Sequence, residues 1–303
     1  ESILHSTERP TRGTIHTGRG PDKRTHHLEL HNNEIGRCGG DAAAGGRGGR
    51  WMGTDMSVLQ SRWLRRFGSA EGGELQLVCF PHAGGAASAY VGLSRALAPD
   101  IDVVSVQYPG RQDRRLEPAL TSLPHLARAV AEELARAPRR PYAFFGHSMG
   151  AVVAYETARV LAEFDLAAPR HLILSGRGAP SPEPRAGDRL AGDAALISEI
   201  RRLGGTGSRV LDDPELMEMV LPTLRADYGA LGLYRWEPGP PLDIPLTAMV
   251  GTADPIVTVD DVHGWLAHST RPGELLTFPG GHFYLDTQLP TVAAALRTLL
   301  TPA

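Results

Sequence analysis

The stretch that decides the fold is YAFFGHSMGAVVAYE, residues 142–156, in which one serine stands between two glycines. An apolar run precedes the first glycine, and a helix-like run follows the second. This order is typical of the strand–turn–helix elbow that presents a nucleophilic serine at the end of a buried strand. Gly-x-Ser-x-Gly alone occurs by chance in a glycine-rich chain, so the flanking runs carry the argument. We therefore predict that Ser148 is a nucleophile and not merely a small residue at a tight turn.

The chain around this stretch alternates β-like runs with helical ones. The β-like runs are 74–80, 101–108, 142–145, 171–176, 246–251 and 274–278. They are continuous stretches of apolar residues, which is typical of parallel strands buried on both faces. The sequence therefore predicts an α/β fold with a mainly parallel central sheet flanked by helices.

A long segment separates the predicted strands 171–176 and 246–251. It holds roughly sixty residues, far more than an ordinary connection in such a fold. Two stretches in it, 193–203 and 213–231, have helical patterns. Because a helical insertion over one end of a sheet can cover a site there, we expect a helical lid at about 180–237.

A serine hydroxyl becomes a good nucleophile when an imidazole takes its proton, and an acid must orient that imidazole. In folds with this elbow the chain order is serine, acid, histidine. Asp254 follows the predicted strand 246–251, at the same sheet edge as Ser148. Asp260 and Asp261 compete for the role, but they begin a helix-like stretch, where carboxylates usually cap. Asp254 is the predicted acid.

The predicted base is His282, in a glycine-flanked loop after the strand 274–278. His263 and His268 fall inside a helical stretch and are expected at the surface. A lone histidine usually has a structural role. Three candidate groups at three strand ends, in the expected order, favour catalysis by His282.

The stretch CFPHAGGAASAY, residues 79–90, follows the first strong strand and contains consecutive glycines. An acyl-transfer site needs backbone amides for the developing oxyanion, one from such a loop and one from the residue after the nucleophile. We assign these amides to Ala83 and Met149. His82 is interpreted as a loop residue that shapes this turn, in preference to a catalytic role.

At these residues the chain resembles the type II thioesterases, α/β-hydrolases that accompany polyketide synthases and nonribosomal peptide synthetases. The resemblance spans almost all of residues 60–300. PGRQDR and LRADY are its more specific parts, whereas GHSMGA and GGHFYL are shared with many hydrolases. The matching stretches are CFPHAGG (79–85), VQYPGRQDR (106–114), GHSMGA (146–151), LPTLRADY (221–228), GTADP (251–255) and GGHFYL (280–285).

The resemblance implies a freestanding editing enzyme that hydrolyses misprimed or stalled acyl groups from the phosphopantetheine arm of acyl or peptidyl carrier proteins. It implies that Ser148 attacks the thioester, that His282 acts as base and then acid, and that Asp254 orients His282. The lid at about 180–237 would gate acyl entry. No metal or organic cofactor is implied.

Carrier proteins are typically acidic, so arginines are candidate docking charges. The candidates lie in GRQDRR and APRRP and are Arg111, Arg114, Arg115, Arg139 and Arg140. The alternative is that both stretches are ordinary loops with a structural role.

The composition excludes several other classes. The formal net charge of −3 gives no basic field for nucleic acid. Cys38 and Cys79 form no disulfide framework or metal motif, which fits a reducing cytoplasm, and Cys79 is expected in the core. The chain shows no apolar run long enough to span a membrane. We expect a monomer without a membrane or nucleic-acid partner.

Residues 1–55 differ from the rest because they contain the low-complexity run GGDAAAGGRGGR and few large apolar residues. Such a segment buries little surface and is interpreted as a disordered extension. Met56 would make a natural start, and residues 56–303 are assigned to the thioesterase domain.

Two other functions use the same fold and triad. One is a general carboxylesterase or lipase-like hydrolase of small esters, and the other is a chain-releasing thioesterase at the end of a synthase. The motifs PGRQDR and LRADY argue against the first, and the lack of an upstream carrier-protein serine motif argues against the second. A non-enzymatic interaction protein would not need all three triad candidates.

Overall fold

The computed structural model describes residues 61–68, 74–137, 140–182, 185–190, 192–204 and 213–301. The predicted extension 1–55 and the proposed start at Met56 lie outside these residues. The assignment of 56–303 to one thioesterase domain stays a prediction.

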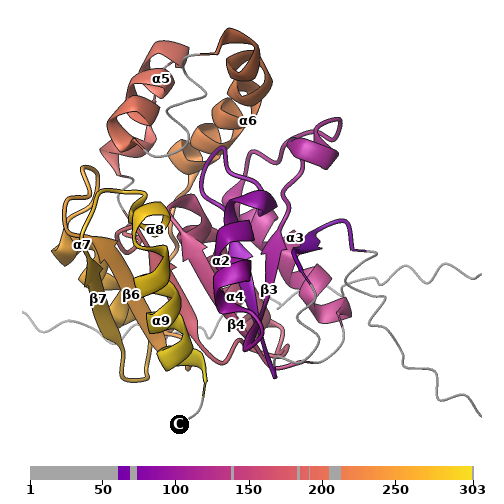
Figure 1. Cartoon of the computed structure of the whole chain (residues 1–303), viewed down its shortest axis with the longest axis vertical. Coiled ribbons are helices and arrows are strands. Elements are labelled where there is room, and N and C mark those ends of the chain that lie inside the picture. Colours follow the sequence, from indigo (N-terminus) through magenta and orange to yellow (C-terminus); the bar gives the residue numbers. More distant parts are fainter. Residues whose placement is uncertain are drawn as a thin grey trace, which may run out of the picture. The chain divides into compact units, whose positions relative to one another are not determined.

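Seven strands form one sheet in the order β1-β3-β2-β4-β5-β6-β7 (Figure 1). β1 pairs antiparallel with β3, and all the other neighbours pair in parallel. The predicted, mainly parallel sheet is therefore confirmed. The strands are β1 (Leu64–Arg66), β2 (Leu75–Phe80), β3 (Ile101–Val106), β4 (Tyr142–His147), β5 (Leu172–Ser175), β6 (Leu246–Gly251) and β7 (Glu274–Phe278).

The short edge strand β1 was not predicted. It has three residues, two of which are arginines, and so lacks the apolar run that marked the other strands. Leu64 is buried, whereas the two arginines are partly exposed. Its place in the sheet depends on pairing with β3, which no local pattern reveals.

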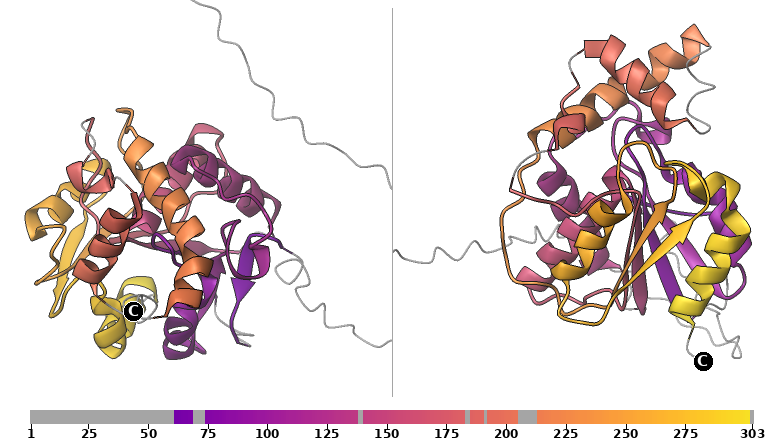
Figure 2. Two further views of the ribbon diagram at one scale, coloured as in Figure 1. Left: turned by 90° about the horizontal axis from the view of Figure 1, so that it is seen from above. Right: turned by 90° about the vertical axis from the view of Figure 1, so that its left-hand side faces the viewer.

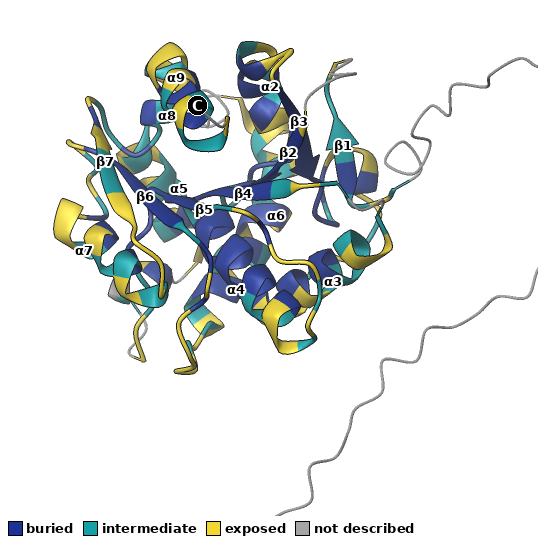
Figure 3. Ribbon diagram, turned by 90° about the horizontal axis from the view of Figure 1, so that it is seen from below, coloured by how far each residue is buried: buried dark blue, intermediate teal, exposed yellow. Residues whose placement is uncertain are grey.

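Helices cover both faces of the sheet (Figure 3). α2 and α9 pack together on one face, and α3 and α4 pack together on the other. The helices outside the long insertion are α2 (Val91–Leu97), α3 (Leu123–Arg136), α4 (Met149–Glu163), α7 (Val259–His263), α8 (Tyr284–Thr287) and α9 (Leu289–Leu300). Short 3-10 turns are η1 (Ala87–Tyr90), η2 (Gln112–Arg114), η3 (Ala186–Asp188) and η5 (Gly264–His268).

The core is divided by the sheet because alternate residues of a strand point to opposite faces. Along β2, Val78 and Phe80 join the cluster under α3 and α4. Leu77 and Cys79 join the cluster under α2 and α9. The prediction that Cys79 is a core residue is confirmed, since it is fully buried. Both faces of β2 pack into the core, which explains why Gln76 is its single polar residue.

The insertion between β5 and β6 holds α5 (Gly192–Leu203) and α6 (Pro214–Leu233). Both lie over the carboxyl ends of the strands (Figure 1; Figure 2, right). Asp213 caps α6 by accepting hydrogen bonds from the Glu215 and Leu216 amides, and Pro214 starts the helix, where its missing N–H costs nothing. The two helices match the predicted stretches, while their role as a lid stays a prediction.

Of the helices within the described ranges, none has both the length and the apolar composition to cross a membrane.

Candidate active site

Ser148 occupies the turn between β4 and α4. Its φ of 57° and ψ of −121° form a strained conformation for a residue with a side chain. Its amide donates to the Ser175 carbonyl at 2.8 Å, which ties the turn to β5. A Cβ on Gly146 would overlap the backbone of Gly150, and one on Gly150 would overlap the Phe80 carbonyl. The two glycines are therefore required by close backbone packing, as in a nucleophile elbow.

Replacing Gly150 with alanine is expected to lower the free energy of unfolding by roughly 2–3 kcal/mol, because the new methyl group collides with the β2 backbone. Urea denaturation measures the change. Gly229→Ala in α6 is the matched control, since a Cβ there meets open space and alanine is the better helix former. A Gly150 variant as stable as the Gly229 variant would contradict this account of the elbow.

Asp254 and His282 lie in the loops after β6 and β7 and contact each other. The Asp254 Oδ2 atom is 2.8 Å from His282 Nδ1, and both side chains are fully buried. The other carboxylate oxygen accepts the Ile256 amide at 2.9 Å, which fixes the carboxylate. His282 Nε2 is buried and has no partner among the described residues. With Nδ1–H donating to the carboxylate, Nε2 is free to take a proton.

The structure separates Asp254 from its competitors. The Asp261 carboxylate accepts from the Thr258 amide and the Thr258 hydroxyl at the start of α7, so it has the predicted capping role. His263 is exposed, as predicted. The prediction for His268 was wrong. It is half-buried, lies 3.0 Å from the Tyr155 hydroxyl and packs against Trp265.

The loop after β2 places Ala83 in a turn, which the Gly85 amide closes by donating to the His82 carbonyl at 2.9 Å. Met149 is the first residue of α4. In the described part of the chain neither the Ala83 nor the Met149 amide has an acceptor. First-turn helix amides have no intrahelical partner, so Met149 can donate to a ligand. Both loops leave the same edge of the sheet, after β2 and β4.

Two further histidines surround His282. The His147 ring lies 4.9 Å from the His282 ring and 6.3 Å from the His82 ring. Burial, together with the nearby His282 and Arg111, lowers the pKa of His82 to about 4. Burial and the two other histidines also lower the pKa of His147. At neutral pH both rings are therefore uncharged and add no charge beside His282.

The low pKa of His82 makes folding sensitive to acid. The unfolded chain takes up a proton below about pH 6.5, whereas the folded chain resists until about pH 4. Stability is therefore lost as the pH falls through this window. We expect the His82→Gln variant to lose less free energy of unfolding than the parent chain between pH 7 and pH 5, by on the order of 2 kcal/mol.

Urea denaturation at pH 7 and pH 5 checks this difference. His125→Gln is the control, because His125 is exposed at the start of α3. Parallel pH dependences for the parent chain and both variants would contradict a neutral His82 with a lowered pKa in the folded chain.

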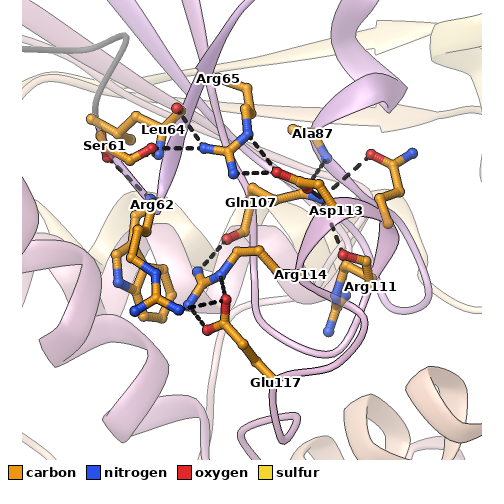
Figure 4. Close-up of polar contacts among 12 residues, drawn as sticks. Ser61, Arg62, Leu64, Arg65, Ala87, Gln107, Arg111, Asp113, Arg114 and Glu117 are labelled. Carbon is orange, nitrogen blue, oxygen red and sulfur yellow. Dashed lines mark hydrogen bonds and ion pairs between the residues drawn. The ribbon is translucent and has the colours of Figure 1, made fainter.

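The structure corrects two of the proposed docking charges (Figure 4). Arg114 is buried, donates to the Gln107 carbonyl at 2.8 Å, pairs with Glu117 and lies over the Trp63 ring. Arg111 is buried as well and forms a two-pronged pair with Asp227. Neither guanidinium is available to bind a carrier protein, because both are buried and donate to acceptors within this chain.

Of the remaining arginines, Arg140 is partly buried and pairs with Asp102 at 3.2 Å. Arg115 is exposed. Arg139 lies outside the described residues. Arg115 is thus the candidate with an exposed side chain. In the described ranges, no three His, Cys, Asp or Glu side chains are arranged to hold a metal ion.

Comparisons with known proteins agree with this geometry. A model of the thioesterase domain family matches residues 75–300. The chain is 45% identical over 249 residues to the probable cadicidin biosynthesis thioesterase of Streptomyces griseus, covering 82% of this chain and 69% of that protein. It is also 45% identical over 242 residues to Thioesterase PikA5 of Streptomyces venezuelae, covering 77% of this chain and 83% of that protein.

Solved structures give the same result. The type II thioesterase BorB from the borrelidin biosynthetic cluster matches with a TM-score of 0.71 and 40% identity, covering 78% of this chain and 96% of that chain. The fold is therefore that of the α/β-hydrolases, as expected. The chain belongs to the thioesterase family. Its relatives are type II thioesterases of polyketide and nonribosomal peptide clusters, so it is a hydrolase with a thioesterase role in such a pathway.

Proposed function

We propose that this chain hydrolyses acyl groups from the phosphopantetheine arm of acyl or peptidyl carrier proteins, with Ser148 as nucleophile. One observation carries the proposal. The buried Asp254–His282 pair, with His282 Nε2 free, lies at the sheet edge where the elbow presents Ser148. The family membership supports the thioester as substrate.

In the first half of the reaction, Ser148 Oγ attacks the thioester carbonyl carbon and its proton passes to His282 Nε2. The carbonyl oxygen becomes an oxyanion, which the Ala83 and Met149 amides stabilise. When the tetrahedral intermediate collapses, the carbon–sulfur bond breaks and His282 returns its proton to the leaving thiolate. The acyl group is then bound to Ser148 as an ester.

In the second half, water attacks this ester and gives its proton to His282 Nε2. The new tetrahedral intermediate expels the Ser148 alkoxide, which takes the proton back from His282. The carboxylic acid leaves, and the enzyme is restored. Asp254 keeps the His282 Nδ1–H in place and stabilises the imidazolium that forms twice in each cycle.

The insertion of about 180–237 is proposed as the lid of this site. α6 lies against the loop after β2, since a Cβ on Gly84 would overlap the Leu224 side chain. A helix in this place can limit access of the acyl chain and of water. Removal of misprimed or stalled acyl groups, as an editing function, is part of the proposal.

The test compares one short acyl group on two carriers. We expect kcat/KM for the acyl group on a purified carrier protein to exceed that for the same acyl group on a simple oxyester by at least a hundredfold. Preference for the oxyester would favour a carboxylesterase. Transfer of the acyl group to another acceptor in place of release as the free acid would favour a chain-releasing thioesterase.

A further inference from the structure

The two sequence motifs that are most specific to this family meet in one buried contact. Arg111 belongs to PGRQDR after β3, and Asp227 belongs to LRADY on α6. Arg111 NH1 and NH2 each lie 2.8 Å from an Asp227 carboxylate oxygen. The side chains are 5% and 0% exposed. The pair therefore joins the insertion to the body of the enzyme.

The same two side chains also hold the loop that contains Ala83. The Gly84 amide donates to Asp227 Oδ2 at 2.7 Å. Arg111 NH1 donates to the Gly85 carbonyl at 2.9 Å. These two contacts fix the Ala83–Gly84 and Gly85–Ala86 peptide groups, and the positive φ of 74° at Gly84 allows the chain to turn between them.

Side chains from the loop after β3 hold the far end of the same loop. Gln107 Oε1 accepts from the Ala87 amide at 2.8 Å (Figure 4). The Thr223 hydroxyl on α6 donates to the Gly110 carbonyl at 2.8 Å. The insertion helix, the loop after β3 and the loop after β2 are thus one hydrogen-bonded unit with Arg111 and Asp227 at its centre.

A buried ion pair of this kind gives little net stability, because both charges lose their water. Removal of one partner leaves the other charged and unpaired. Such a pair is better suited to fixing a geometry than to holding the fold together. An oxyanion donor needs that precision, since its effect depends on its placement before the reaction begins.

We propose that Arg111 and Asp227 are positioning residues that set the Ala83 amide for the oxyanion and couple its placement to the docking of α6. The proposal rests on the proposed function, in which Ala83 donates to the oxyanion. Neither residue touches the acyl group. The Ala83 amide is correctly placed when α6 lies against the loops after β2 and β3, as in this structure.

The experiment uses the full chain and the acetyl thioester of N-acetylcysteamine, a small mimic of the phosphopantetheine arm. We expect Asp227→Ala to lower kcat by about 10- to 100-fold, less than the loss of a whole oxyanion donor, with KM changed by less than about threefold. Asp227→Asn keeps the shape of the side chain and one acceptor oxygen, so its kcat should fall less than that of Asp227→Ala. Affinity for a trifluoromethyl ketone, which forms an oxyanion on the enzyme, should fall by the same factor as kcat.

Asp188→Ala is the matched control. Asp188 forms a similar two-pronged pair with Arg177 in the insertion, and both side chains are 10% exposed. We expect its kcat to stay within about threefold of the parent chain. Equal losses in the Asp188 and Asp227 variants would overturn the proposal in favour of general stabilisation of the insertion. Folded Asp227 variants, by thermal melting, with parent kcat and inhibitor affinity would overturn it as well.

Ser148→Ala, assayed with the same thioester, distinguishes a failure of the positioning role from a failure of the proposed function. If hydrolysis depends on Ser148 and the Asp227 variants behave as the parent chain, the positioning role alone is wrong. If hydrolysis survives Ser148→Ala, the proposed function with Ser148 as nucleophile is wrong, and the positioning role, which rests on it, is overturned with it.

Discussion

Replacing Ser148 with alanine is expected to lower kcat for thioester hydrolysis by about 10⁵- to 10⁶-fold. The variant keeps the elbow, but it has no oxygen to attack the thioester carbonyl and forms no acyl-enzyme. The residual rate comes from stabilisation of the oxyanion and from orientation of the substrate. Release of the free thiol measures kcat for the parent chain and for the variant, and the variant is followed over hours at high enzyme concentration.

Ser105→Ala is the matched control for this loss. Ser105 is fully buried in β3, in the same sheet, and its hydroxyl has no partner within the described residues. Its removal should leave kcat within about twofold of the parent chain. A Ser148 variant that keeps more than about a tenth of the parent kcat would contradict the assignment of the nucleophile.

Replacing Asp254 with asparagine is expected to lower kcat by about 10⁴-fold. The asparagine can fill the same space, but its amide nitrogen would face His282 Nδ1 and favour the tautomer in which Nε2 carries the proton. His282 could then no longer accept the proton of Ser148. Steady-state kinetics at pH 7 to 9 measures the loss.

Asp261→Asn is the control, because Asp261 is the competing carboxylate and caps α7. Loss of its charge is expected to cost about 1 kcal/mol of stability and to leave kcat nearly unchanged. A larger loss of kcat in the Asp261 variant than in the Asp254 variant would reverse the assignment of the acid.

Features encoded in local runs of sequence could be predicted. Five of the six parallel strands, β2 to β6, are almost fully buried, so each reads as a mostly apolar stretch. β7 lies at the edge of the sheet and is partly exposed. The elbow could be predicted because close backbone packing demands glycine at 146 and 150. Asp254 could be chosen over Asp261 because capping explains the second residue without catalysis.

Features that depend on tertiary contacts could not be predicted. Arg111 and Arg114 were interpreted as exposed charges. The sequence does not show that Asp227, 116 residues further along the chain, contacts Arg111 in the folded protein. His268 was assigned to the surface because its contacts, Tyr155 and Trp236, belong to other elements. The signal for the Arg111–Asp227 pair was present only as two separate family motifs, with no indication that they meet.

The measurement that tests the central claim most directly is the identification of the covalent intermediate. The parent chain is mixed with an acyl thioester, quenched in acid within milliseconds and digested, and the modified peptide is sequenced by mass spectrometry. We expect an acyl group on Ser148, in amounts that rise and decay with turnover. An acyl group on another residue, or product formation with no acylated Ser148 at any time, would contradict it.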